Sequence, residues 1–207
     1  MLRRTILTGF AAIAMLAALP VRADTPDDGA KQFVKGISDR ALTALKDNAP
    51  KAQRDEAFRA ILHDGFATHA IGAFCLGGYW QKASEQQRAE YQKLFEELIV
   101  QSYSQRLRSV YNGQELVFGT TRPDGKSGTW VSSRFSASAN APAEEVLWRV
   151  RRGEGDQYKV IDVVFANVSL VVTQRDDFVS ILQRNNGNMD EFLATLRDKV
   201  AKLQSAA

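Results

Sequence analysis

The sequence predicts an α+β domain in which helices come first, one antiparallel sheet follows and helices return at the end. Between residues 33 and 107 the apolar residues recur every three or four positions, the period of an amphipathic helix, and the same period returns at residues 178–203. Over residues 115–164 they alternate, which is typical of strands. The links between these strands are short, so neighbouring strands are expected to be antiparallel. The 207 residues suit a single domain of this kind.

The first helix is expected to begin at Thr25-Pro26-Asp27-Asp28, which supplies a capping side chain, a first-turn proline and acids at the positive helix end. Its apolar face comprises Phe33, Val34, Ile37, Ala41, Leu42 and Leu45. Asn48-Ala49-Pro50 ends it, and a second helix follows over residues 51–66. A third, over residues 69–76, is closed by Gly77-Gly78.

The longest helix is predicted over residues 84–110, where Ser84 and Gln87 form a capping box. Its apolar stripe comprises Tyr91, Leu94, Phe95, Leu98, Ile99, Ser102 and Leu107. Four strands are expected next, over residues 115–121, 129–137, 144–151 and 158–164, with turn residues between them. Two helices close the chain, over residues 177–183 and 189–203.

The N-terminus has the three parts of a secretory signal peptide. Met1-Leu2-Arg3-Arg4 is basic, residues 5–19 are apolar and uncharged, and Val21-Arg22-Ala23 places small side chains at positions −3 and −1 of a cut after Ala23. The apolar stretch is shorter than the roughly 20 residues that cross a bilayer. We therefore expect cleavage, a mature domain over residues 24–207 and a periplasmic location.

Cleavage removes Arg3, Arg4 and Arg22 and no acid, so Lys+Arg falls from 27 to 24 and equals the 24 Asp+Glu. The basic isoelectric point near 9.0 is therefore largely a property of the leader. No net charge remains to attract a nucleic acid, and none is expected as a partner. The single cysteine, Cys75, excludes an internal disulfide framework and predicts a small buried apolar residue.

Signatures of catalysis are sparse. The sequence contains no Gly-x-Ser-x-Gly, no Walker loop, no Gly-x-Gly-x-x-Gly after a strand and no His-Glu-x-x-His. Its histidines, His63 and His69, lie six residues apart and do not share a helix face, so we expect no metal site. Asp162, in an apolar strand, is either a base with a raised pKa or a partner for a backbone amide or for a cation such as Lys159 or Arg175.

Aromatic residues occur in both the helical and the strand segments. They either fill a close-packed core or, where helices splay from the sheet, line an apolar cavity, and periodicity does not separate these cases. In the strand around Trp148, Val146 and Val150 share its face, so Trp148 is expected to point inward. The two faces of the strand around Trp130 are nearly balanced.

Two blocks of the sequence carry a resemblance to a known family. The first is Leu76-Gly77-Gly78-Tyr79-Trp80, followed by Ser84-Glu85-Gln86-Gln87-Arg88 and by Phe95 to Tyr103. The second runs from Tyr158 to Val164, through Val168-Ser169-Leu170-Val171, to Arg175, Phe178 and residues 180–182. Together the two blocks resemble the MlaC family, also known as the toluene-tolerance family, of periplasmic lipid-transfer proteins. Gly78 stands where the family usually has Arg, and Thr173-Gln174-Arg175 replaces the commoner Asn-Tyr-Arg. This second departure resembles a hopanoid-associated branch of the family.

The resemblance implies a twisted sheet of about four strands packed against helices around an apolar cavity that holds the acyl chains of a phospholipid or a hopanoid-like lipid. Such a carrier exchanges lipid with an inner-membrane transporter bearing an MCE-type subunit and with an outer-membrane lipoprotein complex. Its bound lipid is cargo, and neither a cofactor nor a catalytic residue is expected. The residues expected to face the cavity are Phe74, Leu76, Tyr79, Trp80, Phe95, Leu98, Trp130, Trp148, Val160 and Phe165.

Two other functions remain open at the level of sequence. An isomerase or dehydratase acting on an apolar substrate in the same cavity would use an acid such as Asp162 as its base. A ligand-free periplasmic adaptor would instead bind protein partners through an exposed face and keep a filled core.

Overall fold

The computed structural model describes residues 27–46, 49–111, 113–137, 143–153, 155 and 157–205. The predicted leader and Thr25-Pro26 lie outside these residues. Seven helices and five strands follow one another in the described chain. They are α1 (Asp28–Lys46), α2 (Lys51–Gly65), α3 (Thr68–Leu76), α4 (Tyr79–Lys82), α5 (Glu85–Val110), β1 (Leu116–Asp124), β2 (Gly128–Phe135), β3 (Glu144–Arg152), β4 (Tyr158–Phe165), β5 (Val168–Ser169), α6 (Leu170–Arg184) and α7 (Met189–Ser205).

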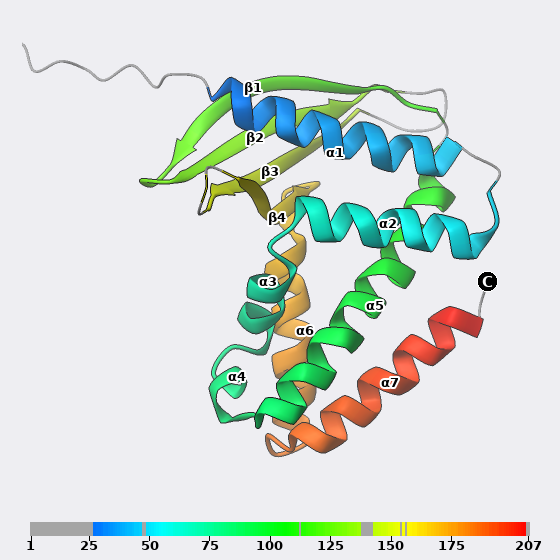
Figure 1. The fold of residues 1–207 in the computed structure, drawn as a ribbon, viewed down its shortest axis with the longest axis vertical. Helices are drawn as coiled ribbons and strands as arrows, with labels where there is room; N and C mark the ends of the chain where they lie inside the picture. Colours follow the sequence, from blue (N-terminus) through cyan, green and yellow to red (C-terminus); the bar gives the residue numbers. More distant parts are fainter. Residues whose placement is uncertain are drawn as a thin grey trace, which may run out of the picture.

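The α+β class is confirmed, with the sheet at one end of the molecule and most helices at the other. Figure 1 shows α1 alongside the sheet, α2 across the middle, α3, α4, α6 and α7 in the lower part, and α5 rising from the lower end past α2 toward the sheet. Among the described residues, no helix is both long enough and apolar enough to span a membrane.

The sheet is antiparallel throughout and its strands follow chain order, β1-β2-β3-β4-β5. It has five strands where about four were expected, because Val168 and Ser169 pair with Phe165 and Val164 as a short edge strand. The turn between them places Ala166 at φ 49° and Asn167 at φ 64°. Consecutive residues in the left-handed region are typical of tight hairpins whose twist matches that of the strands.

Buried apolar side chains form two separate clusters. The first, here called the helical core, draws on α3 and α5 to α7 and comprises Cys75, Leu76, Ala83, Tyr91, Phe95, Leu98, Phe178, Leu182, Met189, Phe192, Leu193, Leu196 and Val200. The second, the sheet core, joins α1 and α2 to β2, β3 and β4 and comprises Ala30, Val34, Ile37, Ile61, Val131, Val150 and Val160. No described residue belongs to both clusters, so the part of the chain that the structure describes has two hydrophobic centres.

The helix boundaries agree with the predicted ones except around α6 and α4. The helix expected over residues 177–183 begins earlier, at Leu170, because the Ser169 side chain accepts a hydrogen bond from the Val172 backbone N–H and caps it. The one-turn helix α4 was not predicted. The capping box of α5 is present, with Ser84 Oγ accepting from the Gln87 N–H at 3.1 Å and Gln87 Oε1 accepting from the Ser84 N–H at 3.0 Å.

Candidate functional site

The residues predicted to face a cavity lie in three different settings. Leu76, Phe95 and Leu98 are almost fully buried in the helical core, and Tyr79 and Trp80 pack against it. Val160 is fully buried in the sheet core, against which Trp148 packs. The other three, Phe74, Phe165 and Trp130, lie outside both clusters. The structure therefore divides the predicted set between two cores and the surface.

The helical core is centred on a cluster of aromatic rings that contact one another in tilted and edge-on arrangements. Tyr91 has four aromatic ring neighbours, including Phe95 at 5.7 Å and Phe178 at 6.0 Å between centroids. Its hydroxyl donates to the Gly72 carbonyl at 2.9 Å, which satisfies its one polar group. Burial raises the pKa of this phenol, so it stays neutral.

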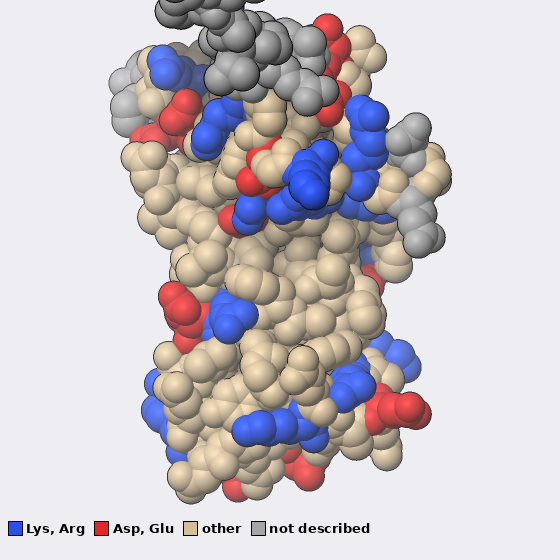
Figure 2. Space-filling view, turned by 90° about the vertical axis from the view of Figure 1, so that its left-hand side faces the viewer, with Lys and Arg blue, Asp and Glu red and all other residues tan. Residues whose placement is uncertain are grey.

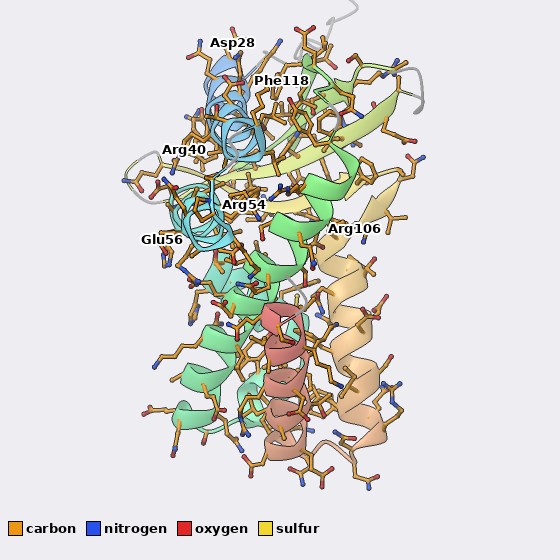
Figure 3. The ribbon with its side chains drawn as sticks, turned by 90° about the vertical axis from the view of Figure 1, so that its right-hand side faces the viewer. Asp28, Arg40, Arg54, Glu56, Arg106 and Phe118 are labelled. Carbon is orange, nitrogen blue, oxygen red and sulfur yellow. The ribbon has the colours of Figure 1, made fainter. Side chains whose placement is uncertain are left out.

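The sheet core places one tryptophan on the inner face of the sheet, as its neighbours predicted. Trp148 pairs across strands with Val131, which is fully buried, and its Nε1–H donates to Ser133 Oγ at 2.9 Å. Phe118 packs against the same cluster and, in Figure 3, lies on the part of the sheet next to α1. The inner face therefore carries partly buried aromatic side chains around the closely packed centre.

Trp130 lies on the outer face of the sheet, because it is adjacent to the inward-facing Val131 on the same strand. Its ring is flanked by two guanidinium groups, with Arg122 at 5.2 Å and Arg149 at 5.3 Å from the centroid. Asp124 in turn pairs with Arg149 at 2.6 Å. Figure 2 shows Lys and Arg side chains gathered over this sheet half of the molecule. We therefore leave Trp130 out of the candidate lining.

Phe74 and Phe165 are among the most exposed large apolar side chains of the described chain, at 46% and 39%. The Arg175 guanidinium lies 4.6 Å from the Phe74 ring centroid, and its Nη1 donates to the Phe74 carbonyl at 3.0 Å. Phe165 pairs with the exposed Val168 at the β4–β5 hairpin. Both phenylalanines therefore lie at the surface in this structure.

A polar network joins α2 to α5 between the two cores, and sequence reasoning did not find it. Asp55 of α2 is 7% exposed and accepts hydrogen bonds from Ser104 Oγ at 2.8 Å and Gln101 Nε2 at 2.9 Å, both on α5. Lys51 Nζ bonds Asp55 at 2.8 Å and also donates to Gln101. The signal in the sequence was the pair Gln101 and Ser104, whose spacing places them on one helix face.

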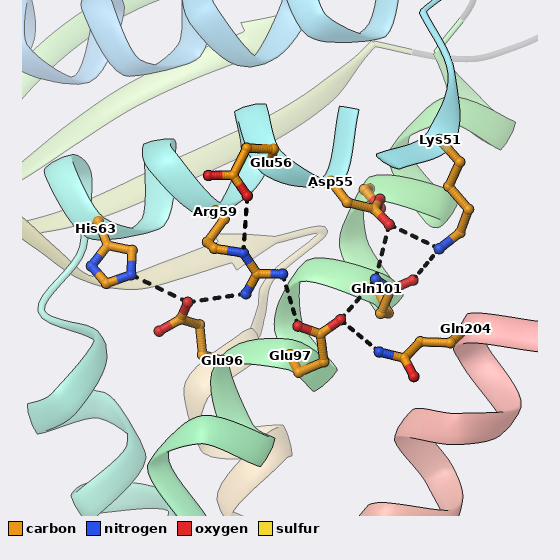
Figure 4. A network of polar contacts seen from close by, with 10 residues as sticks. Lys51, Asp55, Glu56, Arg59, His63, Glu96, Glu97, Gln101 and Gln204 are labelled. Atoms are coloured by element: carbon orange, nitrogen blue, oxygen red, sulfur yellow. Dashed lines mark hydrogen bonds and ion pairs between the residues drawn. The ribbon is translucent and has the colours of Figure 1, made fainter. Parts of the chain in front are cut away.

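The network continues along α2 through Arg59. Its guanidinium donates to Glu97 at 2.8 Å and to Glu96 at 3.1 Å, and Figure 4 shows it between the two acids. Glu97 also accepts from Gln204 of α7 at 2.9 Å, and His63 Nε2 lies 3.2 Å from Glu96. The network thus ties α2 to both α5 and α7.

Hydrogen bonding sets the ionisation of this network. Burial opposes the charge on Asp55, but hydrogen bonds from Lys51, Ser104 and Gln101 outweigh it and lower the pKa. Burial likewise opposes the charge on Glu97, and bonds from Arg59 and Gln204 lower its pKa. The hydrogen bond to Glu97 raises the pKa of Arg59. All three groups are therefore charged near neutral pH.

The Asp162 carboxylate is hydrogen-bonded within the fold. It accepts from Ser169 Oγ at 2.6 Å and from the Val171 backbone N–H at 3.2 Å, so it holds the start of α6 to β4. The backbone amide expected as a partner is present, but the suggested cations bond elsewhere. Lys159 donates to the carbonyls of His63 and Asp64, and Arg175 donates to that of Phe74.

Cys75 is buried, as predicted, and its thiol contacts the Val171 carbonyl at 3.7 Å. Burial raises the pKa of the thiol to about 12, so it is protonated and unreactive at neutral pH. His69 contacts the Trp80 ring edge-on, with centroids 5.4 Å apart. Within the part of the chain that the structure describes, no three His, Cys, Asp or Glu side chains group as metal ligands.

Two open depressions lie on the sheet. One, of about 410 Å³, is lined by residues that flank the irregular register of β1, among them Phe118 and Ser133. The other, of about 320 Å³, lies where the β1–β2 turn meets the start of α1 and is lined by charged residues such as Arg122 and Asp27. Neither is the enclosed apolar cavity expected between the sheet and the helices. The described apolar side chains pack instead in the sheet core and in the helical core.

These features define a class of protein: an α+β domain in which an open antiparallel sheet and a helical bundle each have an apolar core, joined by a polar seam. Comparison with known families is consistent with this description. The chain belongs to the MlaC family, whose model, described as MlaC protein, matches residues 35–198.

Relatives of similar length support this assignment. The toluene tolerance protein ttg2D of Pseudomonas putida is 26% identical over all of this chain and 94% of its own length. The intermembrane phospholipid transport system binding protein MlaC of Haemophilus influenzae is 25% identical over 96% of this chain and 92% of its own. A phospholipid-binding protein from Ralstonia solanacearum, solved in complex with a phospholipid, superposes with a TM-score of 0.71 at 19% identity, covering 84% of this chain and 98% of the other.

Proposed function

We propose that this protein is a periplasmic carrier that binds the acyl chains of a phospholipid between the sheet core and the helical core and moves the lipid between membranes. The observation that carries the proposal is membership of the MlaC family over residues 35–198. It is supported by a relative described as a phospholipid transport binding protein and by a similar fold solved with a phospholipid.

Elementary thermodynamics explains why such a carrier is needed. Each buried CH₂ is worth about 0.8 kcal/mol, so a tail of about 16 carbons faces ~13 kcal/mol on entering water. A protein that replaces the contacts of the bilayer lowers this cost without breaking a covalent bond. It must also release its cargo, so the protein should not bind the lipid much more tightly than a membrane does.

The proposed lining comes from predicted residues that lie on either side of the polar seam. Trp148 and Val160 belong to the sheet side, and Phe95 and Leu98 belong to α5. Leu76, Tyr79 and Trp80 extend the apolar surface along the helical side. Because these groups pack in two separate clusters, we propose that lipid enters by parting the clusters rather than by filling a preformed hole.

We further propose that the leader is removed after Ala23 and that the mature protein works in the periplasm. Its partners would be an inner-membrane transporter with an MCE-type subunit and an outer-membrane lipoprotein complex. The lipid is cargo and no bond is made or broken. The hydrogen bonds of Asp162 support a carrier over an isomerase or dehydratase. Both oxygens of its carboxylate accept bonds within the fold, one from Ser169 Oγ and one from the Val171 N–H.

A pair of tryptophans on opposite faces of the sheet provides the test. We expect the protein to extract fluorescently labelled phosphatidylethanolamine from vesicles and deliver it to unlabelled ones. Trp148→Ala should slow transfer by about tenfold or more, because burial of one large apolar side chain is worth roughly 1.5–3 kcal/mol and about 1.4 kcal/mol is a factor of ten. Trp130→Ala, on the outer face, is the matched control and should transfer lipid at the normal rate.

Circular dichroism would first establish that both variants are folded. Absence of transfer by the unmodified protein, together with absence of bound lipid after incubation with vesicles, would contradict the proposed function. Equal effects of the two substitutions would remove Trp148 from the lining.

A further inference from the structure

Two buried polar side-chain atoms in the described part of the chain have no hydrogen-bond partner. They are Ser38 Oγ on α1 and Gln174 Nε2 on α6. Buried polar atoms in folded proteins are nearly always paired, because an unpaired one keeps the full cost of leaving water. The Gln174 nitrogen carries two N–H donors, so it is the larger of the two exceptions and it is a donor only.

Gln174 lies on α6 between the sheet and the helical core. Three residues earlier, the Val171 N–H donates to Asp162 of β4. Four residues later, Phe178 is fully buried in the helical core. Residues three and four apart share a helix face, so the Gln174 side chain projects from the same face of α6 as Val171 and Phe178. The unpaired donor therefore lies where the proposed function places an acyl chain.

The same side chain also lies at the border between the interior and solvent. Gln174 is partly buried and its nitrogen is shielded, whereas Thr173 and Asp176 beside it on α6 are exposed. A diacyl lipid is divided in the same way, with its tails apolar, its head group in water and its two ester groups between them. A lipid that buries its tails against this face of α6 brings its ester groups to the depth of Gln174.

The surroundings of Gln174 favour a neutral acceptor. Val171 and Phe178, which share its helix face, are apolar, and a charged phosphate buried beside them would need a cation. The guanidinium of the next residue, Arg175, instead donates to the Phe74 carbonyl and lies over the Phe74 ring. A carbonyl oxygen accepts an N–H without burying a charge, and an ester supplies one directly beside the acyl chain.

We propose that Gln174 Nε2 donates a hydrogen bond to an ester carbonyl of the bound lipid, and that this bond makes the protein select diacyl lipids over lipids of the same shape that lack the carbonyl. The inference rests on the proposed function for the presence of a lipid. Selectivity follows because a lipid without the acceptor leaves the buried donor unpaired.

Competition between an ester and an ether lipid tests the proposal. Vesicles of dioleoyl phosphatidylglycerol would carry equal amounts of dioleoyl phosphatidylethanolamine and of its dioleyl ether analogue, which has the same head group and chain length but no carbonyl. After incubation with lipid-free protein, mass spectrometry measures the two phosphatidylethanolamines that the protein has bound. The unmodified protein should hold the ester form in about fivefold excess, as expected for one neutral hydrogen bond.

Gln174→Met removes the donor and nearly preserves the size of the side chain. In this variant the ratio of ester to ether should fall to the ratio in the vesicles. Gln183→Met is the matched control, because it makes the same change at an exposed position of the same helix. It should keep the fivefold excess, and circular dichroism would establish that both variants are folded.

Urea unfolding of the lipid-free protein tests the unpaired donor without any cargo. Gln174→Met should unfold at a higher urea concentration than the unmodified protein, because it removes a buried group that has no partner. Gln183→Met should leave the midpoint unchanged. A lower midpoint for Gln174→Met would show that the amide is already paired in the empty protein and would overturn the inference.

The competition separates this inference from the proposed function. Equal binding of ester and ether lipid by the unmodified protein, or an ester excess that persists in Gln174→Met, would overturn the role of Gln174 and leave a lipid carrier in place. Binding of no phospholipid at all by the unmodified protein would instead contradict the proposed function.

Discussion

Asp162 shows how a carboxylate in an apolar strand serves the fold. Its two oxygens are taken by the hydroxyl of Ser169 and the N–H of Val171, at 2.6 and 3.2 Å. These bonds place the first turn of α6 against β4 and join the helical unit to the sheet. The sequence predicted that a backbone amide was one possible partner, but the choice of Ser169 depends on a hairpin whose geometry the sequence pattern does not show.

We predict that Asp162→Asn lowers stability and leaves lipid transfer intact. The amide side chain can accept only through one oxygen, so one of the two bonds is lost, at a cost of about 1–3 kcal/mol. Urea unfolding measures the loss, and vesicle transfer by the folded variant measures function. An enzyme using Asp162 as its base would show the opposite result, with stability retained and turnover abolished.

The two tryptophans of the sheet show where residue-level prediction succeeds. Trp148 has valines two residues away on each side, and alternation therefore placed it on the inner face. Around Trp130 the alternation was balanced, and the structure places it on the outer face, where its ring contacts Arg122 and Arg149 on neighbouring strands. Contacts of that kind depend on strand pairing, which a single strand does not encode.

At the scale of elements, helices with strong local signals were predicted well. The capping box fixed the start of α5, and Asn-Ala-Pro separated α1 from α2. The run Val168-Ser169-Leu170-Val171-Val172 is rich in β-branched residues, which obscured the start of α6. There, the cap from Ser169 and the bond to Asp162 outweigh local propensity, so a tertiary contact decides where the helix begins.

The contact between α2 and α5 was not predictable from apolar periodicity. Gln101 and Ser104 are 4% and 5% exposed although both side chains are polar. Their burial follows from the position of Asp55 on a helix about 50 residues earlier, which no local pattern connects to them. The sequence patterns therefore predicted the two helices but not the hydrogen bonds from Gln101 and Ser104 to Asp55 that join them.

This contact gives stability a defined dependence on pH. The pKa values of Asp55 and Glu97 are lowered, because hydrogen bonds from their partners outweigh the effect of burial. Their contribution to stability is therefore fully present above the ordinary carboxyl pKa of about 4 and is lost as the pH falls below it through the lowered values.

Urea unfolding between pH 7 and pH 3 measures this dependence. We expect Asp55→Asn to be less stable than the unmodified protein at pH 7, by about 1–3 kcal/mol, and to lose less stability on acidification. Parallel loss of stability in the two proteins would show that Asp55 does not contribute to the acid sensitivity.

At the scale of the whole molecule, the change of hydrophobic period along the chain was sufficient to predict the α+β class. The division into two cores was not, because it depends on how α2 and the sheet pack against α5 and the bundle. The expected cavity was not predictable either, because its existence also depends on how the two units pack against each other. In this structure the apolar side chains of the two units pack in two clusters.

Native mass spectrometry can show directly whether this fold carries a phospholipid. The protein would be expressed with its leader, recovered from the periplasm without detergent and examined intact. The account predicts a stoichiometric adduct with the mass of a phospholipid, reduced in Trp148→Ala and retained in Trp130→Ala. A protein that is free of lipid as isolated, and still free of it after incubation with phospholipid vesicles, would contradict the account.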